Sequence, residues 1–316
     1  MKKNTSLLCA LGAGLAFLTF YRQRRRETTA RRWSQQVERQ PGAALVTGAS
    51  AGIGATFARA LARQGFHLVL VARREDRLRQ LADELEHTYS IKAEVLRADL
   101  TDPLDLERVA ARLAEIPDLD LLVNNAGFGT SGYFVETDIP TELQMIQLHV
   151  IASVRLIHAA LPVMIRRGQG GIINVSSVAS LMALPGNATY SATKNYLNFF
   201  TRSLNAELAG TGVRVETLLP GFTITEFHDV QGGGRPRTPR WMWCRAEDVV
   251  EEALQGLREG REVVIPGRLY AAVGWALRFI PPELVTAIAA PVQRLRLKPS
   301  GKTAARPAGD RPVSQA

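Results

Sequence analysis

The middle of this 316-residue chain alternates between short apolar runs and longer stretches with helical spacing. After the first run, for example, Phe57, Ala58, Leu61 and Ala62 recur at helical intervals. Continuously apolar strands separated by helices predict a parallel sheet that helices cover on both faces. We therefore expect one doubly wound α/β domain over residues 41–268, with a seven-stranded parallel sheet. Six of its strands are expected at residues 43–46, 67–72, 93–98, 119–123, 171–175 and 213–219.

The formal charge of +9 is concentrated at the two ends of the chain. Residues 1–32 carry eight basic side chains and one acidic, residues 294–316 carry six and one, and the remaining middle has a small acidic excess. A nucleic-acid-binding protein places its basic stripe on the folded domain, so we expect no nucleic-acid partner. Basic ends are typical of contact with anionic membrane surfaces or of plain solvation.

The first 40 residues are predicted to be an apolar anchor helix followed by a basic linker. Residues 5–21 are apolar or small, which is near the lower limit of about 17 residues for spanning a bilayer. The arginine-rich cluster over residues 22–32 favours a cytoplasmic catalytic domain on a membrane-associated protein. A cleaved signal peptide and a helix that is soluble or lies on the membrane surface are the alternatives.

A second apolar segment, residues 269–297, predicts C-terminal helices that Pro281 and Pro282 divide into pieces too short to span a membrane. They could cap the core, form a dimer contact or lie in the plane of a membrane. Residues 298–316 have the composition of a disordered tail. Only Cys9 and Cys244 are present, so the sequence predicts neither a disulfide framework nor a metal site.

A glycine-rich run, residues 47–54, stands where the first strand meets the first helix. Gly48 suits a tight turn, Gly52 allows the backbone to approach a pyrophosphate, and Gly54 allows close packing of helix on strand. The free N–H groups of the helix N-terminus then attract phosphate. This context predicts a dinucleotide site, the alternative being a glycine-rich turn without a ligand.

The end of the second strand predicts which nicotinamide cofactor binds there. A carboxylate at this position would hold the ribose 2′-hydroxyl and repel a 2′-phosphate. Here Ala72 is followed by Arg73 and Arg74, so NADP(H) is favoured over NAD(H). Arg73 is the expected phosphate contact, and Arg74 is expected to be solvated.

Tyr190 and Lys194 are four residues apart, and Ser177 precedes the tyrosine by 13 residues. Residues i and i+4 share one face of a helix, so the ammonium can approach the phenol. A nearby cation stabilises a phenolate and lowers a phenol pKa that is otherwise about 10. The set predicts a tyrosine that donates and accepts protons near neutral pH.

Together these motifs resemble the short-chain dehydrogenase/reductase family over about residues 42–268. The motifs are the glycine run, Ala98-Asp99-Leu100, Asn124-Asn125-Ala126-Gly127, Asn174-Val175-Ser176-Ser177, Tyr190-Ser191-Ala192-Thr193-Lys194 and Pro220-Gly221. The resemblance implies a Rossmann-type fold, a homodimer or homotetramer, and a catalytic set of Ser177, Tyr190 and Lys194. Asn124 would support the sheet. The implied cofactor-binding residues are Gly48, Ser50, Gly52, Ile53, Gly54, Arg73, Asp99, Asn125, Ala126, Gly127, Tyr190, Lys194, Pro220, Gly221 and Thr225.

One departure from the family's pattern lies at His149, where the family usually has an asparagine that holds a water on the proton path from the lysine. Histidine can also form hydrogen bonds and relay protons, so His149 is a further candidate catalytic residue. The alternative is a buried histidine that replaces the hydrogen bonds of the asparagine without relaying a proton.

The sequence therefore predicts an NADP(H)-dependent oxidoreductase that interconverts a secondary alcohol and a ketone. Residues 222–243 form the expected substrate loop, in which Gly232–Gly234 suit movement and Trp241 and Trp243 suit a lipophilic acyl, steroid-like or retinoid-like substrate. One rival function is reduction of a carrier-bound 3-oxoacyl group, with Arg235, Arg237 and Arg240 as a docking patch. The other is a catalytically idle NADP-binding scaffold or sensor.

Overall fold

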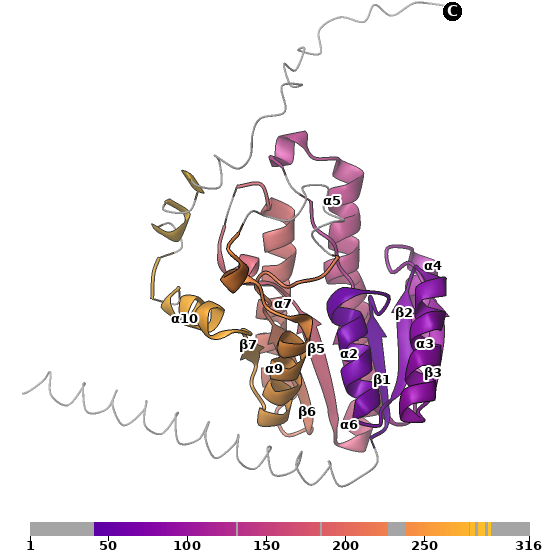
Figure 1. The fold of residues 1–316 in the computed structure, drawn as a ribbon. Coiled ribbons are helices and arrows are strands. Elements are labelled where there is room, and N and C mark those ends of the chain that lie inside the picture. Colours follow the sequence, from indigo (N-terminus) through magenta and orange to yellow (C-terminus); the bar gives the residue numbers. More distant parts are fainter. Residues whose placement is uncertain are drawn as a thin grey trace, which may run out of the picture.

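The computed structural model describes residues 41–130, 132–183, 185–226, 238–277, 279–281, 284–287 and 290–291 (Figure 1). The predicted anchor and linker over residues 1–40 and the predicted tail over residues 298–316 lie outside the described residues. So do the glycines and the first two arginines of the expected substrate loop, because residues 227–237 are not described.

A seven-stranded sheet in the order β3-β2-β1-β4-β5-β6-β7 forms the centre of the domain. Every neighbouring pair of strands is parallel. The strands are β1 Ala43–Thr47, β2 His67–Ala72, β3 Ala93–Arg97, β4 Leu119–Asn124, β5 Gly170–Val175, β6 Val213–Leu218 and β7 Val263–Val264. The predicted Rossmann-type sheet and its seven strands are confirmed, and the six expected strands agree within one residue at each end.

Helices cover both faces of this sheet (Figure 1). The α-helices are α2 Gly52–Arg63, α3 Glu75–Tyr89, α4 Pro103–Ala114, α5 Ile139–Ile146, α6 Ser153–Arg167, α7 Ala188–Glu207, α9 Ala246–Glu259 and α10 Arg268–Ala276. A π-helix, η2 Gln147–Ala152, joins α5 to α6. The shorter 3-10 helices are η1 Phe134–Glu136, η3 Val178–Leu181 and η4 Arg240–Met242.

Two apolar cores lie on opposite faces of the sheet, and β1 divides its side chains between them. Ala44 and Val46 belong to the core under α2, α3 and α9, whereas Ala43 and Leu45 belong to the core under α4, α6 and α7. Phe57 of α2 is fully buried in the first core. Burying such a side chain contributes about 2–3 kcal/mol, so the cores supply much of the stability that holds the strand ends in place.

The C-terminal apolar segment begins with a helix that caps the core, as one of the alternatives predicted. Tyr270 of α10 is 9% exposed, and its hydroxyl donates to the Met242 carbonyl and accepts from the Phe222 amide. Val273 and Trp275 on the same helix are exposed.

Among the described residues, one continuous helical run, Ile139–Arg167, has the length and apolar composition to cross a membrane. Half of its most apolar window is buried inside the domain, where α6 packs against α4 and the sheet. This run is therefore a core element of the fold.

Candidate active site

The carboxyl ends of β1, β4, β5 and β6 meet at one edge of the sheet. In the sheet β1 and β4 are neighbours, with β2 and β3 on the side of β1 and β5 to β7 on the side of β4. The crossover direction therefore reverses between β1 and β4. Open α/β sheets bind ligands in the crevice at such a switch point. The glycine run, residues 124–127, Ser177 and residues 220–225 all follow strands that end at this edge.

The glycine run adopts the geometry of a phosphate cradle. Gly48 and Gly52 have φ angles of +67° and +55°, which favour glycine, and α2 begins at Gly52. A Cβ on Gly54 would lie 2.3 Å from the Gly48 carbonyl oxygen, so a larger residue cannot replace this glycine without displacing the backbone. The N-cap Ala51 offers no side-chain acceptor to the first amides of α2, which suit an anionic ligand instead.

Residues at the end of β4 hold the opposite wall of this cradle. The Asn125 side chain donates to the Thr47 carbonyl at 2.8 Å, and the Thr47 hydroxyl accepts the amides of Asn125 and Ala126 at 2.9 and 3.0 Å. Asn124 is buried and donates to Asn174 of β5 at 2.9 Å. The structure thus brings the predicted residues at 48–54 and 124–127 together, with Asn124 bracing the sheet as expected.

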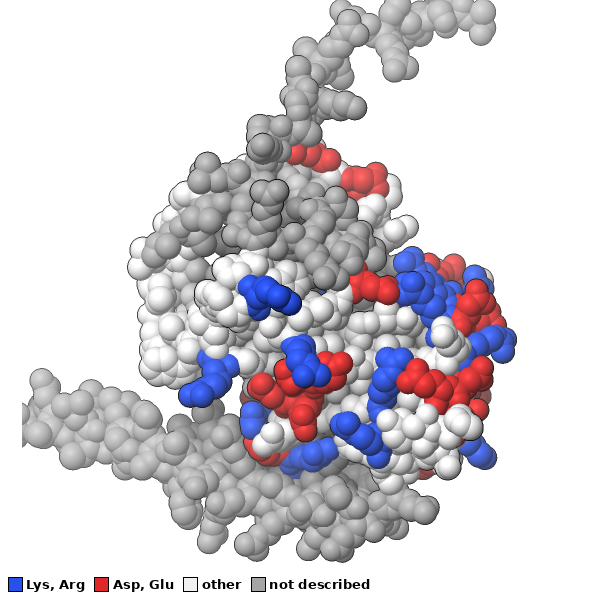
Figure 2. Space-filling view, viewed as in Figure 1, with Lys and Arg blue, Asp and Glu red and all other residues white. Residues whose placement is uncertain are grey.

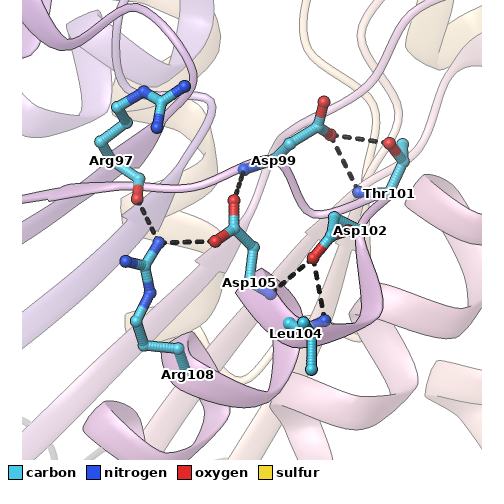
Figure 3. Close-up of polar contacts among 7 residues, drawn as sticks. All are labelled: Arg97, Asp99, Thr101, Asp102, Leu104, Asp105 and Arg108. Carbon is cyan, nitrogen blue, oxygen red and sulfur yellow. Dashed lines mark hydrogen bonds and ion pairs between the residues drawn. The ribbon is translucent and has the colours of Figure 1, made fainter.

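Asp99, one of the predicted cofactor-binding residues, lies just after the end of β3 (Figure 3). Its carboxylate accepts from the amide and hydroxyl of Thr101 at 3.0 and 2.8 Å, and its own amide donates to Asp105 at 2.7 Å. Arg73 lies 3.6 Å from the second carboxylate oxygen. Burial raises the pKa of Asp99, but the Thr101 hydrogen bonds and the Arg73 charge outweigh it, so the carboxyl stays ionised at neutral pH.

The turn that carries Asp99 is itself braced by α4. The Asp102 carboxylate caps α4 by accepting the amides of Leu104 and Asp105, and Arg108 donates to Asp105 and to the Arg97 carbonyl (Figure 3). A capping aspartate of this kind contributes about 1 kcal/mol to helix stability. The Asp99 carboxylate is therefore held in a fixed orientation.

Arg74 is about half exposed, and it also makes two contacts that its place in the sequence did not indicate. Its Nε lies 3.2 Å from the Ser50 hydroxyl, and its Nη1 pairs with Glu226 at 3.2 Å. Glu226 also pairs with Arg77 of α3 at 2.7 Å. Glu226 and Arg77 were missed by sequence reasoning, because 149 residues separate them and no local spacing links them.

Tyr190 and Lys194 lie on α7 as predicted, with the Lys194 Nζ 5.9 Å from the centre of the tyrosine ring. The ammonium donates to the Val175 carbonyl at 2.8 Å, and the lysine is only 4% exposed. Burial lowers the pKa of Lys194 to about 7, so its charge is only partly retained at neutral pH.

The pKa of Tyr190 does not move as the sequence predicted. Burial raises the pKa of the phenol, and the hydrogen bond to Ser177 opposes that rise. The expected lowering of the tyrosine pKa by the lysine charge is therefore not found in this structure.

Ser177 is fixed from two sides at the N-terminus of η3. Its hydroxyl accepts the Ala179 amide at 3.1 Å and hydrogen-bonds to Tyr190. Behind it, the Ser180 hydroxyl donates to the Ser177 carbonyl, and the buried Asn198 side chain donates to Ser180 at 2.7 Å. Ser180 and Asn198 are supporting residues that the sequence motifs did not single out.

His149 is 1% exposed and lies in the π-helix directly beside Tyr190, with ring centres 5.8 Å apart. Its Nε2 accepts the Phe128 amide at 3.2 Å, so the proton is on Nδ1, which donates to Thr193 at 2.9 Å. Burial, and then the charge of Lys194, lower the pKa of His149 well below 6.5. A neutral histidine whose two ring nitrogens are both hydrogen-bonded fits a buried residue that replaces the hydrogen bonds of an asparagine. It fits a proton relay less well.

The residues after β6 complete the crevice. A Cβ on Gly52 would lie 3.1 Å from the Thr225 Cβ, so the predicted contact residue Thr225 rests directly on the glycine run. Gly221 packs on the Tyr270 ring, where a Cβ would lie 2.2 Å away. The rings of Phe222 and Trp243 pack together with their centres 5.4 Å apart, so Trp243 anchors this segment.

Charge on the described surface is mixed. On the face over α2, α3 and α9, basic and acidic side chains are interspersed (Figure 2). The described residues of this face therefore form no continuous basic stripe of the kind that nucleic-acid binders present. Within the described ranges, no group of three or more His, Cys, Asp or Glu side chains is placed to hold a metal ion.

Comparison with known proteins places this geometry in context. The family model of short chain dehydrogenases matches residues 42–232. A solved short-chain dehydrogenase from Sphingobium yanoikuyae in complex with NADPH is 36% identical, with a TM-score of 0.69, and the match covers 76% of this chain and 96% of that one.

Two further similar proteins are an alcohol dehydrogenase and a reductase. The bulky-bulky ketone specific alcohol dehydrogenase from Comamonas testosteroni is 33% identical with a TM-score of 0.65, over 76% of this chain and 95% of that one. The very-long-chain 3-oxoacyl-CoA reductase of Anas platyrhynchos is 30% identical over 251 residues, or 77% of each chain.

Proposed function

Because the chain belongs to the short-chain dehydrogenase/reductase family of nicotinamide-dependent oxidoreductases, we propose that it transfers hydride reversibly between NADP(H) and a secondary alcohol/ketone pair. The observation that carries this proposal is the convergence of Ser177, Tyr190 and Lys194 at the carboxyl edge of the sheet. The tyrosine hydroxyl is hydrogen-bonded to the serine, and the lysine lies beside the ring.

The described residues fit a dinucleotide. The glycine cradle would hold the pyrophosphate, Asp99 the adenine, and Lys194 and Thr225 the nicotinamide end. The bound nicotinamide ring supplies or takes up the hydride. The chain supplies the proton and the orientation of the carbonyl.

Ser177 is placed to hold the substrate carbonyl, since its hydroxyl is already oriented by Ala179 and Tyr190. In the reductive direction Tyr190 donates its phenolic proton to the developing alkoxide, and in the oxidative direction the phenolate takes the proton back. A lysine with a pKa of about 7 can supply a proton to the tyrosine or stabilise the phenolate near neutral pH.

Charge at the end of β2 supports NADP(H) over NAD(H). No acid is present at the strand end itself, where Arg73 and Arg74 follow Ala72 and pair with the more distant Asp99 and Glu226. Two guanidiniums beside the Ser50 hydroxyl would attract a 2′-phosphate. The similar Sphingobium structure holds NADPH. Dissociation constants for NADPH and NADH, measured by fluorescence titration, test the choice, and tighter binding of NADH would contradict it.

The substrate is proposed to be a bulky, lipophilic ketone or alcohol. Phe222 and the exposed Trp241 lie beside the carboxyl edge of the sheet, and one similar protein acts on bulky-bulky ketones. A second candidate, a long-chain 3-oxoacyl thioester, is favoured by the similarity to a 3-oxoacyl-CoA reductase. Arg240 of the proposed docking patch is described, whereas Arg235 and Arg237 lie outside the described residues.

A substrate panel separates these candidates. NADPH oxidation should be measured with diaryl or steroid-like ketones, a long-chain 3-oxoacyl-CoA and a small polar ketone. Turnover of the small ketone alone would contradict a lipophilic substrate. No turnover of any ketone, despite tight NADPH binding, would favour the idle scaffold.

Membrane attachment through the N-terminal segment and homo-oligomerisation are also proposed. Exposed apolar side chains on α5 and α7, among them Leu143 and Phe199, support a contact between copies of the chain. Light scattering after size exclusion tests the oligomer. Carbonate extraction of membranes from cells that express the full chain tests the attachment, and a fully soluble protein would contradict it.

A further inference from the structure

The segment that follows β6, residues 222–226, crosses the crevice as a strap. It leaves the sheet after Gly221, passes over the glycine run at Thr225 and reaches α3 at Glu226. Ile224, Thr225 and Glu226 line one open groove of about 480 Å³ together with residues 50–52 and outward-facing residues of α2, α3 and α9. The strap therefore lies directly against the glycine run that would hold a pyrophosphate.

One end of the strap is fastened to the chain that enters α9. The Cys244 amide donates to the Phe222 carbonyl at 2.8 Å, and the Ile224 amide donates to the Cys244 carbonyl at 3.0 Å. Thr223 and Cys244 form a parallel bridge. The backbone of this end is thus held independently of any side-chain charge.

At the other end Thr225 rests on Gly52, and Glu226 forms ion pairs with two arginines at and before the start of α3. The Glu226 carboxylate accepts two hydrogen bonds from Arg77, at 2.7 and 3.0 Å, and one from Arg74 at 3.2 Å. The Arg77 hydrogen bonds, followed by that of Arg74, lower the pKa of Glu226, so it is ionised at neutral pH. Arg74 reaches Ser50 of the glycine run with its remaining Nε.

We propose that Glu226 is a positioning residue for the cofactor: by pairing with Arg77 and Arg74 it latches the strap over the glycine run and keeps Thr225 against Gly52. The inference rests on the proposed function only in that the cradle binds a nicotinamide dinucleotide. It does not depend on which of the two dinucleotides is preferred, because the pyrophosphate is common to both.

Arg77 and Arg74 make different contacts, so the latch can be tested separately from recognition of a phosphate. The hydrogen bonds of Arg77 described here go to Glu226, whereas Arg74 hydrogen-bonds to both Glu226 and Ser50. Arg77→Gln therefore removes the stronger half of the latch and keeps both contacts of Arg74, and Glu226→Gln removes both halves but keeps the contact of Arg74 with Ser50. Arg79→Gln is the matched control, since Arg79 is an exposed arginine on the same helix that pairs with Glu75 one turn away.

The experiment measures dissociation constants of NADPH and NADH by isothermal titration. Exposed ion pairs are weak, so each latch variant should raise both dissociation constants by about two- to fivefold. The double variant should show no more than the larger single effect, because both changes break one contact. Arg79→Gln should bind both dinucleotides as the wild type does.

Hydrogen exchange of the free protein gives a readout that needs no ligand. The amides of residues 223–226 should exchange faster in Glu226→Gln and Arg77→Gln than in the wild type or Arg79→Gln. Latch variants that match Arg79→Gln in both measurements would overturn the proposal.

Two other outcomes of the titration would also decide whether Glu226 acts as a latch. If Glu226→Gln tightens NADPH alone, the carboxylate competes with the 2′-phosphate and the latch is overturned. A wild type that binds neither dinucleotide overturns the proposed function and the latch together, whereas a wild type that prefers NADH and loses affinity in both variants overturns only the cofactor preference.

Discussion

The catalytic centre and the adenosine end of the crevice use charge in opposite ways. Lys194 and His149 are buried, and burial moves the pKa of each downward. Arg74, Arg77 and Glu226 are about half exposed and keep their charges in water. In the proposed mechanism the buried groups would tune proton transfer, whereas the exposed groups would hold an anionic ligand with weaker and salt-dependent energies.

The largest effect should follow removal of the phenolic hydroxyl. Tyr190→Phe keeps the ring but has no proton to transfer, so kcat for ketone reduction should fall by about 10³-fold. The dissociation constant of NADPH should change little. Tyr196→Phe is the control, because Tyr196 lies on the same helix with 42% exposure. Equal turnover of the two variants would contradict the assignment of Tyr190.

The buried lysine should make stability depend on pH. The folded-state pKa of Lys194 is about 7 and the unfolded value is near 10.5, so the unfolded state binds more protons between these values. The free energy of unfolding of the wild type, relative to Lys194→Met, should therefore rise as pH increases from 7 to 10, by an amount on the order of a few kcal/mol.

Urea unfolding at several pH values measures this difference. Lys92→Met, which removes an exposed lysine, should follow the wild type throughout. A difference between the wild type and Lys194→Met that stays constant with pH would show that the lysine remains charged in the folded protein.

His149 should matter for stability more than for proton transfer. His149→Leu leaves the Phe128 amide and the Thr193 hydroxyl without their histidine partner, which should cost about 1–3 kcal/mol in the free energy of unfolding. His149→Asn should recover part of that loss and keep the pH profile of kcat. His158→Leu, at an exposed site on α6, serves as control. A stable His149→Leu protein whose pH profile has lost one limb would instead support the relay.

The smallest change in binding or activity is expected for Arg74, at the exposed adenosine end of the crevice. Arg74→Gln removes a charge beside the 2′-phosphate site, so the dissociation constant of NADPH should rise about fivefold while that of NADH changes little. Arg166→Gln, at the far end of α6, should change neither. An equal loss for both dinucleotides would mean that Arg74 acts mainly through Glu226.

Much of the fold could be predicted from local patterns. Strands β1 to β6 were predictable because a strand that is buried on both faces is a continuous apolar run in the sequence. The turns were predictable because a positive φ angle favours glycine. The two-residue strand β7 leaves no such mark. The π-helix at Gln147–Ala152 was also missed, because its apolar spacing is that of an ordinary helix.

The site was predictable where a motif acts through its own spacing, as with Tyr190 and Lys194. It was not predictable where distant segments meet. The contact of Glu226 with Arg77 and that of Asn198 with Ser180 depend on the tertiary fold. The direction of the tyrosine pKa was mispredicted for the same reason, since burial is a property of the packed domain.

The most direct test of the central claim is the transfer of label from NADPH to a bulky ketone. NADPH carrying deuterium at the transferable C4 position should give a secondary alcohol with deuterium on the carbinol carbon. Wild type should form this product, and Tyr190→Phe should bind the cofactor but form about 10³-fold less. Alcohol without deuterium at that carbon, or equal product from both proteins, would contradict hydride transfer assisted by Tyr190.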